Sequence, residues 1–545
     1  MMRGLMMDRP LLLSSVIDYA AAIHPKSEVV SVTVEGGQHR YSYVEARKRI
    51  IQLAHGLQEM GVKPGDRVAT LAWNGYRHFE LYFAISAIGA ICHTLNPRLS
   101  TEQMDYIVNH AGDTVLFADL TFLPQLEQVQ GLFPDDLRYV ALTDRAHMPA
   151  ETKLPNLDCY EEILAGKPEE IVWPEFDENT ASGLCYTSGT TGNPKGALYS
   201  HRSNVLHSLF VISTNIGTFG ADKKILPVVP LFHANAWGLP YSAALSGASL
   251  VFPGAALDGP SIFNLMDQEE VYSAWGVPTV WLGLLQEMES RGRKPKGFSQ
   301  TIIGGSAAPG PMIDALEKKY QIDVMHGWGM TEMSPVGTLA ILEPDHKALP
   351  IDKRLQLKRK QGRPMFGVDL KIVDEDGQVL PHDGEAIGEL CVRGSAIVSG
   401  YYNDQPASEA AIDDDGWFRT GDVASISPDS FLTLVDRAKD LVKSGGEWIS
   451  SIDIENDAMG HPGVAEAAVI AIAHPKWDER PLLIVVKAAG ADPSKQEILD
   501  HIAGNLAKWQ VPDEVEFVDE LPHTATGKVS KLKLRQQFKE YILPA

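Results

Sequence analysis

A loop rich in hydroxyls and glycines, with one lysine, is the segment of this sequence best suited to binding an anion. It runs from Tyr186 to Gly196 and follows an apolar stretch. Glycines allow backbone N–H groups to turn toward an anion, and the hydroxyls add further donors. Such a loop can hold phosphate groups, although the same composition is also typical of an ordinary flexible loop. It is not a Walker loop, because Pro194 stands where the second glycine should be.

Four later segments combine charged, aromatic and glycine residues in patterns that could bind a nucleotide. They read GWGMTE at 327–332, WFRTGD at 417–422, DRAKD with KSGGE at 436–447, and TGK at 526–528. Each has an ordinary alternative when taken alone. An isolated Thr-Glu pair caps a helix, a tryptophan fills a core, and a lysine in a polar loop is solvated.

Taken in order, the five segments resemble the adenylate-forming superfamily, which includes acyl-CoA synthetases, luciferases and adenylation domains. The resemblance spans nearly the whole chain, since the matching residues extend from Tyr186 to Lys528. It implies an acid–thiol ligase that forms acyl-AMP and pyrophosphate from a carboxylate and ATP. CoA then displaces AMP to give acyl-CoA. Catalysis of the first step is mainly alignment and neutralisation of charge.

The resemblance implies a nucleotide site with Lys528, Thr331 and Glu332 as catalytic residues. Lys528 would bridge the carboxylate and the α-phosphate as a movable cation. Glu332 would bind Mg²⁺ with the hydroxyl of Thr187, because Mg²⁺ prefers a carboxylate together with phosphates and waters. The residues expected to bind ATP or AMP are Thr187, Ser188, Gly189, Thr190, Thr191, Lys195, Gly305, Ser306, Ala307, His326, Gly327, Trp328, Thr331, Asp422, Arg437 and Lys443.

The resemblance also implies an acyl pocket. We expect His233 to line and gate this pocket rather than to transfer a proton, because a histidine in an apolar stretch is more often a hydrogen-bonded core residue. The bulk of Trp237 should shorten the acyl chain that is accepted. The residues expected to line the pocket are His233, Trp237, Gly304, Gly329 and Pro335.

A turn rich in glycine is expected to line a narrow tunnel for the pantetheine arm of CoA. Its residues are Ser444, Gly445, Gly446, Glu447 and Trp448. The small domain that carries it would rotate about Asp436, the expected hinge, between the two steps. Asp478 stands where the family usually has a glycine, so the residues that bind the CoA nucleotide are left open.

Residues 326–335 resemble short- and medium-chain ligases, including bacterial 3-methylmercaptopropionate–CoA ligases. The expected substrate is therefore a short- or medium-chain alkanoate, with methylthio-substituted acids included. Three alternatives are a ligase that uses a carrier protein as acceptor, a luciferase-like oxygenase, and a degenerate nucleotide-binding protein. The lack of a carrier domain after Lys528 favours free CoA, and the intact polar residues of the motifs disfavour the degenerate protein.

Alternating strand and helix patterns surround the first motifs. Ser42 and Glu45 have the spacing of a capping box, and apolar residues at helical spacing follow. Short apolar strands are predicted at 68–72, 248–252 and 300–303, with helices between them. This alternation predicts an α/β fold whose large N-terminal domain has mainly parallel sheets and crossover helices.

The pattern changes near residue 365. Short strands with acidic and glycine turns, such as a predicted hairpin at 371–377, indicate a β-rich subdomain. A helix after Ser450, two strands and a C-terminal helix then predict a small mobile α+β domain. We therefore expect a large adenylation domain at 1–435 and a small domain at 436–545.

The composition is typical of a folded multi-domain protein: 44% of the 545 residues are hydrophobic, and the net charge is −23. An acidic balance disfavours nucleic acids and anionic membranes as partners. The four cysteines form no CxxC pair, which disfavours a zinc site and a disulfide framework. No apolar stretch reaches the roughly 20 residues of a membrane helix. We expect a cytoplasmic enzyme that binds ATP, CoA and a small carboxylic acid, with a homodimer left open.

Overall fold

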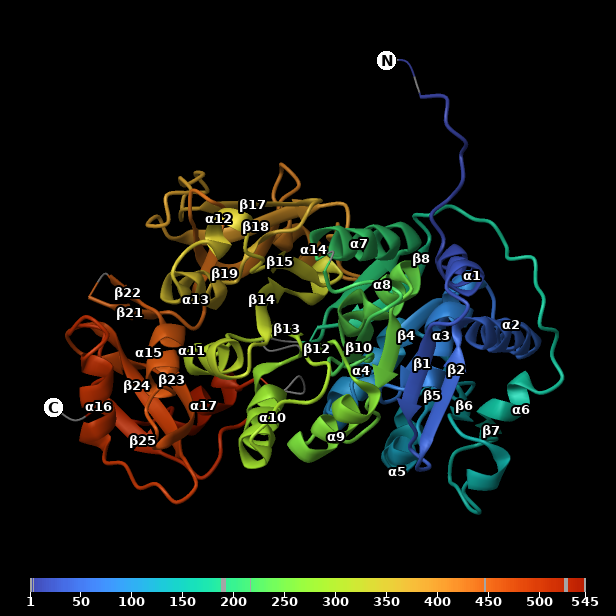
Figure 1. The fold of residues 1–545 in the computed structure, drawn as a ribbon, viewed down its shortest axis with the longest axis horizontal. Coiled ribbons are helices and arrows are strands. Elements are labelled where there is room, and N and C mark those ends of the chain that lie inside the picture. Colours follow the sequence, from blue (N-terminus) through green and yellow to red (C-terminus); the bar gives the residue numbers. More distant parts are fainter. Residues whose placement is uncertain are drawn as a thin grey trace.

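The computed structural model describes residues 2, 4–187, 193–215, 217–445, 447–523 and 528–543, and at Glu447 only the backbone. These residues form two large mixed sheets, a four-stranded antiparallel sheet and a small C-terminal α+β unit (Figure 1). Eight residues of the predicted motifs lie outside the described ranges: Ser188, Gly189, Thr190, Thr191, Gly192, Gly446, Thr526 and Gly527.

The first large sheet has seven strands in the order β7-β6-β5-β3-β4-β8-β9, and all neighbours are parallel except β8 and β9. Tyr186 ends β8 and pairs with Gly196, which begins β9. The predicted phosphate loop therefore connects two adjacent antiparallel strands. The strands are β3 (Arg67–Leu71), β4 (Ile91–Thr94), β5 (Asp113–Ala118), β6 (Arg138–Ala141), β7 (Asp158–Cys159), β8 (Ala181–Tyr186) and β9 (Gly196–Ser200).

The second large sheet has nine strands in the order β16-β15-β14-β13-β12-β10-β11-β1-β2. Its centre is parallel, and antiparallel strands flank both edges. The strands are β1 (Glu28–Val32), β2 (Gln38–Ser42), β10 (Lys224–Pro227), β11 (Ser249–Phe252), β12 (Ser273–Gly276), β13 (Gln300–Ile303), β14 (Asp323–Gly329), β15 (Val336–Leu339) and β16 (Arg363–Pro364).

Helices fill the space between the two large sheets and cover their outer faces. The capping box of Ser42 and Glu45 begins α2, as the sequence predicts. The inner helices, which share one core with strands of both sheets, are α1 (Leu13–Ile23), α2 (Tyr43–Glu59), α3 (Tyr76–Ala87), α7 (His201–Thr214) and α8 (Leu239–Ser246). The remaining helices of this region are α4 (Thr101–Ala111), α5 (Leu123–Val129), α6 (Tyr160–Leu164), α9 (Gly259–Glu269), α10 (Pro278–Arg291), α11 (Gly310–Asp314), α12 (Pro344–Lys347) and α13 (Ile351–Arg359).

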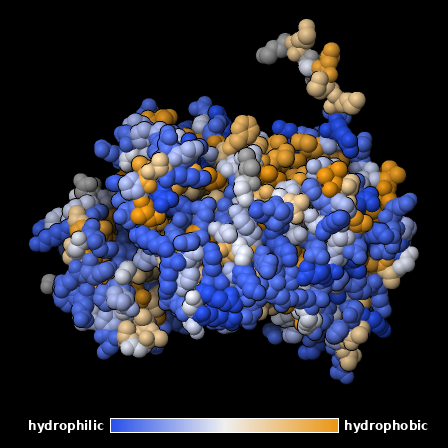
Figure 2. Space-filling view, viewed as in Figure 1, coloured by the Kyte–Doolittle hydropathy of each residue, from blue (hydrophilic) through white to orange (hydrophobic). Residues whose placement is uncertain are grey.

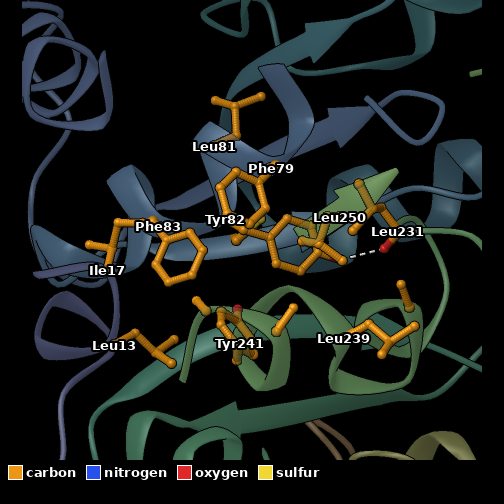
Figure 3. Packing of buried hydrophobic residues seen from close by; sticks show 14 of the residues in the cluster. Leu13, Ile17, Phe79, Leu81, Tyr82, Phe83, Leu231, Leu239, Tyr241 and Leu250 are labelled. Atoms are coloured by element: carbon orange, nitrogen blue, oxygen red, sulfur yellow. Dashed lines mark hydrogen bonds between the residues drawn. The ribbon is translucent and has the colours of Figure 1, made fainter. Parts of the chain in front are cut away.

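The inner core also positions the segment that precedes His233. Tyr82 of α3 donates its hydroxyl hydrogen to the carbonyl of Leu231, the dashed contact in Figure 3. Asn74, which is buried, accepts from the N–H of Leu231 at 2.6 Å and donates to the carbonyls of Pro227 and Val229. These bonds pair the backbone groups of a buried loop that has no strand partner there.

The β-rich subdomain is the antiparallel sheet β17-β18-β19-β20 with helix α14 (Gln405–Ala411). The predicted turn forms after β17, where the N–H of Gly377 donates to the carbonyl of Asp374, but the partner strand β18 begins only at Gly388. Asp436 lies inside β20 and pairs with Val423. The strands are β17 (Val368–Val373), β18 (Gly388–Gly394), β19 (Phe418–Ile426) and β20 (Leu432–Arg437).

The C-terminal unit is a sheet in the order β22-β21-β24-β23, with β25 parallel to β24. Helices α15 and α16 pack on one face, and α17 packs on the other. The elements are β21 (Val442–Ser444), β22 (Glu447–Ile449), α15 (Ser451–Ala458), β23 (Val464–His474), β24 (Asp478–Lys487), α16 (Lys495–Ala503), β25 (Glu514–Phe517) and α17 (Lys531–Gln537). Figure 1 places this unit beside α11 and α13 of the large domain.

The face of the molecule in Figure 2 is mainly hydrophilic. Hydrophobic residues gather on the N-terminal segment, which extends away from the body in Figure 1, and on the surface beside it. Within the described ranges, every helix is too short or too polar to cross a membrane.

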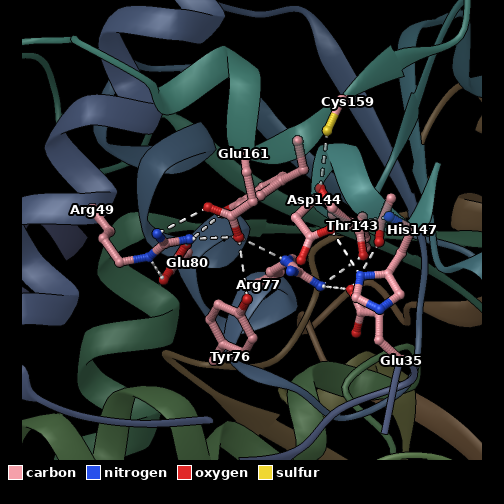
Figure 4. A network of polar contacts seen from close by, with 12 residues as sticks. Glu35, Arg49, Tyr76, Arg77, Glu80, Thr143, Asp144, His147, Cys159 and Glu161 are labelled. Atoms are coloured by element: carbon pink, nitrogen blue, oxygen red, sulfur yellow. Dashed lines mark hydrogen bonds and ion pairs between the residues drawn. The ribbon is translucent and has the colours of Figure 1, made fainter.

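A buried ionic network ties the inner helices to α6 (Figure 4). Glu80 of α3 is fully buried, and its carboxylate binds Arg49 of α2 at 2.7 Å and the hydroxyl of Tyr160 at 2.6 Å. Arg49 also binds Glu161 at 3.0 Å. Burial raises the pKa of the Glu80 carboxyl, and the Arg49 guanidinium opposes that rise. Glu80 therefore depends on Arg49 to remain ionised in the core.

Arg49→Met should strongly lower the thermal stability of the protein. Loss of one partner of a buried ion pair costs about 3–5 kcal/mol, because the remaining charge has no partner. The deficit should shrink as the pH falls, since an unpaired Glu80 has a raised pKa and takes up a proton. Thermal unfolding of the variant and the parent at several pH values measures both effects.

Arg47→Met is the matched control on the same helix. Arg47 binds Asp18 at 2.6 Å, and both side chains are about one-third exposed. An exposed pair of this kind contributes less than about 1 kcal/mol. Equal losses of stability in the two variants would contradict the role assigned to Glu80.

Candidate active site

A cavity of about 750 Å³ lies where the large domain, the β-rich sheet and the C-terminal unit meet. A volume of this size is typical of sites that bind small molecules. The predicted residues that line it are Thr187, Lys195, His233, Trp237, Gly304, Gly305, Gly327, Trp328, Gly329, Thr331, Glu332, Pro335, Arg437 and Lys528. The segment at 417–422 contributes Phe418, Arg419, Thr420 and Gly421 to the lining, so the fold brings together residues from all five segments and from the expected acyl pocket.

Charged groups gather at the polar part of the cavity. The Glu332 carboxylate is buried and accepts a hydrogen bond from the Tyr401 hydroxyl at 2.7 Å. The Lys195 ammonium lies 4.9 Å from the centre of the Tyr401 ring. Burial raises the pKa of Glu332, whereas Tyr401, Arg437 and Lys195 act to lower it. The carboxylate therefore lies among cations rather than in a purely apolar site.

Lys528 reaches this cavity from the C-terminal unit, and its exposed side chain forms part of the cavity lining. Desolvation by the surrounding protein and the charge of Arg437 lower the pKa of its ammonium to about 8, although Asp422 and Glu332 act in the opposite direction. A lysine with a lowered pKa changes its charge near neutral pH, which makes it a candidate for a functional group.

The strand β14 and the turn after it position Thr331 and Glu332. The carbonyl of Thr331 accepts from the hydroxyl of Tyr199 at 2.6 Å, and the carbonyl of Glu332 accepts from the N–H of Val398 at 2.9 Å. Gly329 is required there, because a Cβ atom would lie 2.0 Å from the carbonyl oxygen of Pro335. The turn is therefore held by three separate parts of the chain.

Asp422, Trp328 and Arg437 form one connected group. Asp422 is buried, and its carboxylate accepts from the indole N–H of Trp328 at 2.8 Å and binds the Arg437 guanidinium at 2.6 Å. Trp328 belongs to the core under the β-rich sheet and also lines the cavity. The position of Trp328 is thus compatible with both roles considered for it, as a core residue and as part of the wall of a ligand site.

The apolar part of the cavity is formed around a left-handed turn. Residues Ala234–Trp237 all have positive φ between 44° and 58°. Such a conformation costs L-residues roughly 1–2 kcal/mol each, so the surroundings must hold it in place. The N–H of Ala234 donates to the sulfur of Cys185 at 3.2 Å, and the Trp237 ring lies against Gly304, where a Cβ atom would come within 3.0 Å.

His233 precedes this turn and lines the cavity. Desolvation and the nearby charge of Lys528 lower the pKa of its imidazole to about 4. The ring is therefore neutral at physiological pH, which is compatible with a lining role.

Several predicted residues do not line the cavity. His326 is buried, bonds the carbonyl of Arg359 at 3.0 Å and accepts from the N–H of Ala308 at 3.3 Å, and burial lowers its pKa to about 4. His326 therefore connects β14 to the segment after β13 and to the end of α13, and has a structural role beside the cavity. Other predicted residues outside the lining, among those described, are Ser306, Ala307, Asp422, Asp436, Lys443, Ser444, Gly445 and Trp448.

The predicted tunnel turn lies at the edge of the C-terminal sheet. Ser444 pairs with Glu447 across the β21–β22 turn, and the N–H of Gly445 donates to the carbonyl of Trp477 at 2.9 Å. The Lys443 ammonium lies 4.3 Å from the centre of the Trp448 ring. In this arrangement of the domains, the described residues of the turn pack against their own unit instead of the cavity.

Other residues line the cavity or bind its polar groups without having been predicted. Tyr401 is the most important, because it contacts both Glu332 and Lys195. It lies near no recognised motif, so only its approach to Glu332 in the fold reveals it. Further residues in this class are Asn193, Tyr199, Ile302, Val336 and Leu339.

The residues of the site could bind a hard cation such as Mg²⁺ only if a bound ligand supplied further oxygen atoms. Glu332 offers a carboxylate, and Thr187 offers a hydroxyl oxygen that accepts from the N–H of Lys195 at 3.2 Å. The described residues contain no cluster of three or more metal-ligating side chains of the His, Cys, Asp or Glu type. Mg²⁺ suits such a site, because it keeps waters and ligand phosphates in its shell.

Comparison with known proteins matches residues 17–402 to the AMP-binding enzyme family, and residues 453–528 to the AMP-binding enzyme C-terminal domain. The chain is 50% identical to a 3-methylmercaptopropionyl-CoA ligase of Ruegeria lacuscaerulensis, over 99% of this chain and 100% of the relative. It is 46% identical to a medium-chain-fatty-acid–CoA ligase of Ectopseudomonas oleovorans, over 99% and 98% of the two chains.

Solved structures share the fold. The crystal structure of the anthranilate CoA ligase AuaEII in complex with anthranoyl-AMP has a TM-score of 0.85, with 24% identity and coverage of 98% of both chains. ATP-bound MatB from Rhodopseudomonas palustris has a TM-score of 0.81, with 25% identity, covering 97% of this chain and 99% of that one.

Trace labelling of Lys528 with an acylating reagent should show a midpoint near pH 8 instead of the ordinary 10.5. Only the neutral amine reacts, so the rate of labelling against pH measures the pKa. Glu332→Gln should lower the midpoint, because it removes a negative charge, and Arg437→Met should raise it. Mass spectrometry of the labelled peptide gives the rates. An unchanged midpoint in both variants would contradict the electrostatic coupling within the cavity.

Proposed function

The chain belongs to the AMP-binding enzyme family, in which it is an acid–CoA ligase, and we propose that its cavity joins a short- or medium-chain alkanoate to CoA in two steps. In the first step the carboxylate attacks the α-phosphate of ATP, forming acyl-AMP and releasing pyrophosphate. In the second step the CoA thiol attacks the acyl carbon and AMP leaves. The observation that carries this proposal is one cavity in which Lys195, Glu332 and Lys528 adjoin an apolar wall.

The first step needs positive charge where negative charge accumulates. We assign Lys195 and the phosphate loop to the β- and γ-phosphates, and Lys528 to the carboxylate and the α-phosphate. Preorganised cations in a partly desolvated site stabilise the transition state more effectively than cations in water. Thr331 is assigned to the α-phosphate, and Trp328 to the adenine.

Mg²⁺ is the cofactor that we propose for this site. Glu332 and Thr187 would hold it together with phosphate oxygens of ATP, and it would supply charge neutralisation at the departing pyrophosphate. The support is chemical, because the buried Glu332 carboxylate borders the cavity and hard oxygen ligands are those that Mg²⁺ prefers.

The second step requires a path for the CoA thiol. We propose that the C-terminal unit turns about Asp436, withdraws Lys528 and brings the turn at 444–448 to the cavity. The location of that turn outside the cavity supports such a movement, since a fixed arrangement would leave it without contact with the acyl group. Of the small domain expected at 436–545, the residues that follow Asp436 would then move together.

The substrate class follows from the apolar part of the cavity. Its walls include Trp237, Ile302, Val336 and Leu339, which suit an uncharged alkyl or thioether chain. The Trp237 ring lies against Gly304 and near the fully buried Trp275, with the two tryptophan ring centres 6.4 Å apart. We propose that this packing limits the length of the chain and favours short and medium acids, with 3-methylthiopropionate among them.

A panel of carboxylic acids, assayed for pyrophosphate and AMP release with and without CoA, tests the function. Short and medium alkanoates should give pyrophosphate without CoA, and AMP and acyl-CoA with it. Lys528→Ala should abolish acyl-AMP formation but still convert supplied acyl-AMP to acyl-CoA. Dependence on a carrier protein, or oxygen consumption with acyl-AMP, would overturn the proposal in favour of the alternative ligase or the oxygenase.

Trp237→Gly should shift the preference toward longer or bulkier acids. Glycine adopts the φ of +58° at this position without strain, so the variant removes the ring and keeps the turn. The ratio of the rates of pyrophosphate release with long and with short acids measures this shift. The ratio does not depend on how much of the variant enzyme is active. Trp237→Phe, which keeps a ring, should remain closer to the parent. An unchanged ratio would remove Trp237 from the pocket wall.

A further inference from the structure

The chain passes from the β-rich sheet to the C-terminal unit at the end of β20, and polar contacts cross this point. The N–H of Ala438 donates to the carbonyl of Gly421 at 3.0 Å. The hydroxyl of Ser450 donates to the carbonyl of Val435 at 2.6 Å. Helix α15, which begins directly after Ser450, also contacts β20. The first turn of α15 is therefore docked on the end of the strand.

The Asp436 carboxylate lies at the N-terminus of α15. One of its oxygens accepts from both the N–H of Ser451, at 2.8 Å, and the hydroxyl of the same serine. Asp436 is 3% exposed and Ser451 is fully buried. A carboxylate at the beginning of a helix pairs a backbone N–H that lacks a partner within the helix, and it also interacts favourably with the helix dipole.

Lys531 completes this contact from helix α17. Its ammonium donates to the Ser451 hydroxyl and forms an ion pair with Glu455 at 2.8 Å. The Ser451 hydroxyl thus accepts from Lys531 while it donates to Asp436. Glu455 in turn accepts from the N–H of Val469 in β23, which anchors it in the C-terminal sheet.

The Lys531 ammonium offsets part of the negative charge of this group, and Arg535 pairs with Asp440 at 2.7 Å. Asp436, Glu455 and Asp440 all interact favourably with the Lys531 ammonium, which is itself largely buried. Asp453, in the first turn of α15, is exposed, and its negative charge adds no attraction to Asp436. Removal of the lysine would leave several carboxylates close together with little water, which is costly.

We propose that Lys531 is a positioning residue for acyl-AMP formation: through Ser451 it holds the Asp436 carboxylate against α15, and so fixes the C-terminal unit with Lys528 in the cavity. We call Asp436, Ser451, Glu455 and Lys531 the hinge latch. The inference rests on the proposed two-step function. It explains what holds the C-terminal unit in the position, with Lys528 in the cavity, that acyl-AMP formation requires.

The latch is specific to this arrangement of the domains. Asp436 lies on β20, whereas Ser451, Glu455 and Lys531 all belong to the C-terminal unit. Rotation of the unit about Asp436 would separate the carboxylate from the N-terminus of α15. Lys531 also lies only three residues after Lys528, so the segment that completes the latch is continuous with the one that delivers Lys528 to the cavity.

Lys531→Met and Ser451→Ala test the latch in the full-length enzyme by separating the two half-reactions. Both variants should slow acyl-AMP formation by about tenfold, the effect of losing one charge-assisted hydrogen bond that favours the first arrangement. Both should retain the conversion of supplied acyl-AMP to acyl-CoA within about twofold. Lys531→Arg, which preserves the charge and the donors, should restore acyl-AMP formation.

Lys533→Met is the matched control, because Lys533 is exposed on the same helix and does not line the cavity. The Ser451→Ala variant distinguishes a positioning role of the latch from direct contact of Lys531 with the substrate. Lys531 borders the cavity, whereas Ser451 is fully buried and is not part of the lining. Slow acyl-AMP formation in Lys531→Met alone, with Ser451→Ala like the parent, would overturn the latch. Equal loss of both half-reactions would overturn it as well.

Limited trypsin digestion gives a readout that does not require activity. Release of the latch should speed cleavage after Arg437 and Lys439, identified by mass spectrometry, in Ser451→Ala relative to the parent. Unchanged cleavage in a folded Ser451→Ala protein would overturn the latch even if the parent enzyme is active. A parent that forms no acyl-AMP from any acid would instead refute the proposed function, and the digestion would still test the latch.

Discussion

The local concentration of positive charge in a strongly acidic protein is the constraint on which this structure depends. The chain carries a net charge of −23, yet ATP and CoA are polyanions. Lys195 comes from the end of the phosphate loop, Arg437 from the last residue of β20, and Lys528 from the C-terminal unit. No single element could supply all three cations to one cavity. The association of separate domains around the cavity is therefore a consequence of the charge that the ligands require.

Buried charges elsewhere in the molecule follow the same rule of local compensation. Glu80 depends on Arg49, Asp422 on Arg437, and Asp436 on Ser451 and the Lys531 ammonium. The Glu80–Arg49 pair joins two helices of the large domain, whereas the contacts of Asp436 join β20 to the C-terminal unit. Buried ion pairs add little net stability compared with apolar packing, but losing one partner is costly. They are therefore suited to specifying one arrangement over another.

The apolar part of the site shows how backbone conformation and packing depend on each other. The left-handed turn at Ala234–Trp237 is unfavourable for isolated L-residues. It persists because Tyr82 and Asn74 hold the preceding loop, Cys185 accepts the first N–H of the turn, and Gly304 leaves room for the Trp237 ring. Backbone strain and the proposed limit on substrate length therefore meet at Trp237.

The order of the motifs and the positions of many elements could be predicted from the sequence, because they depend on local patterns. Capping at Ser42, the strand at 300–303 and the helix after Ser450 are such features. The contacts between Trp328 and Asp422, Glu332 and Tyr401, and Lys531 and Ser451 could not, since they join residues about 70 to 90 positions apart. Residue types and spacing indicate which groups can do chemistry, whereas only folding decides which distant partners neutralise and orient them in a desolvated site.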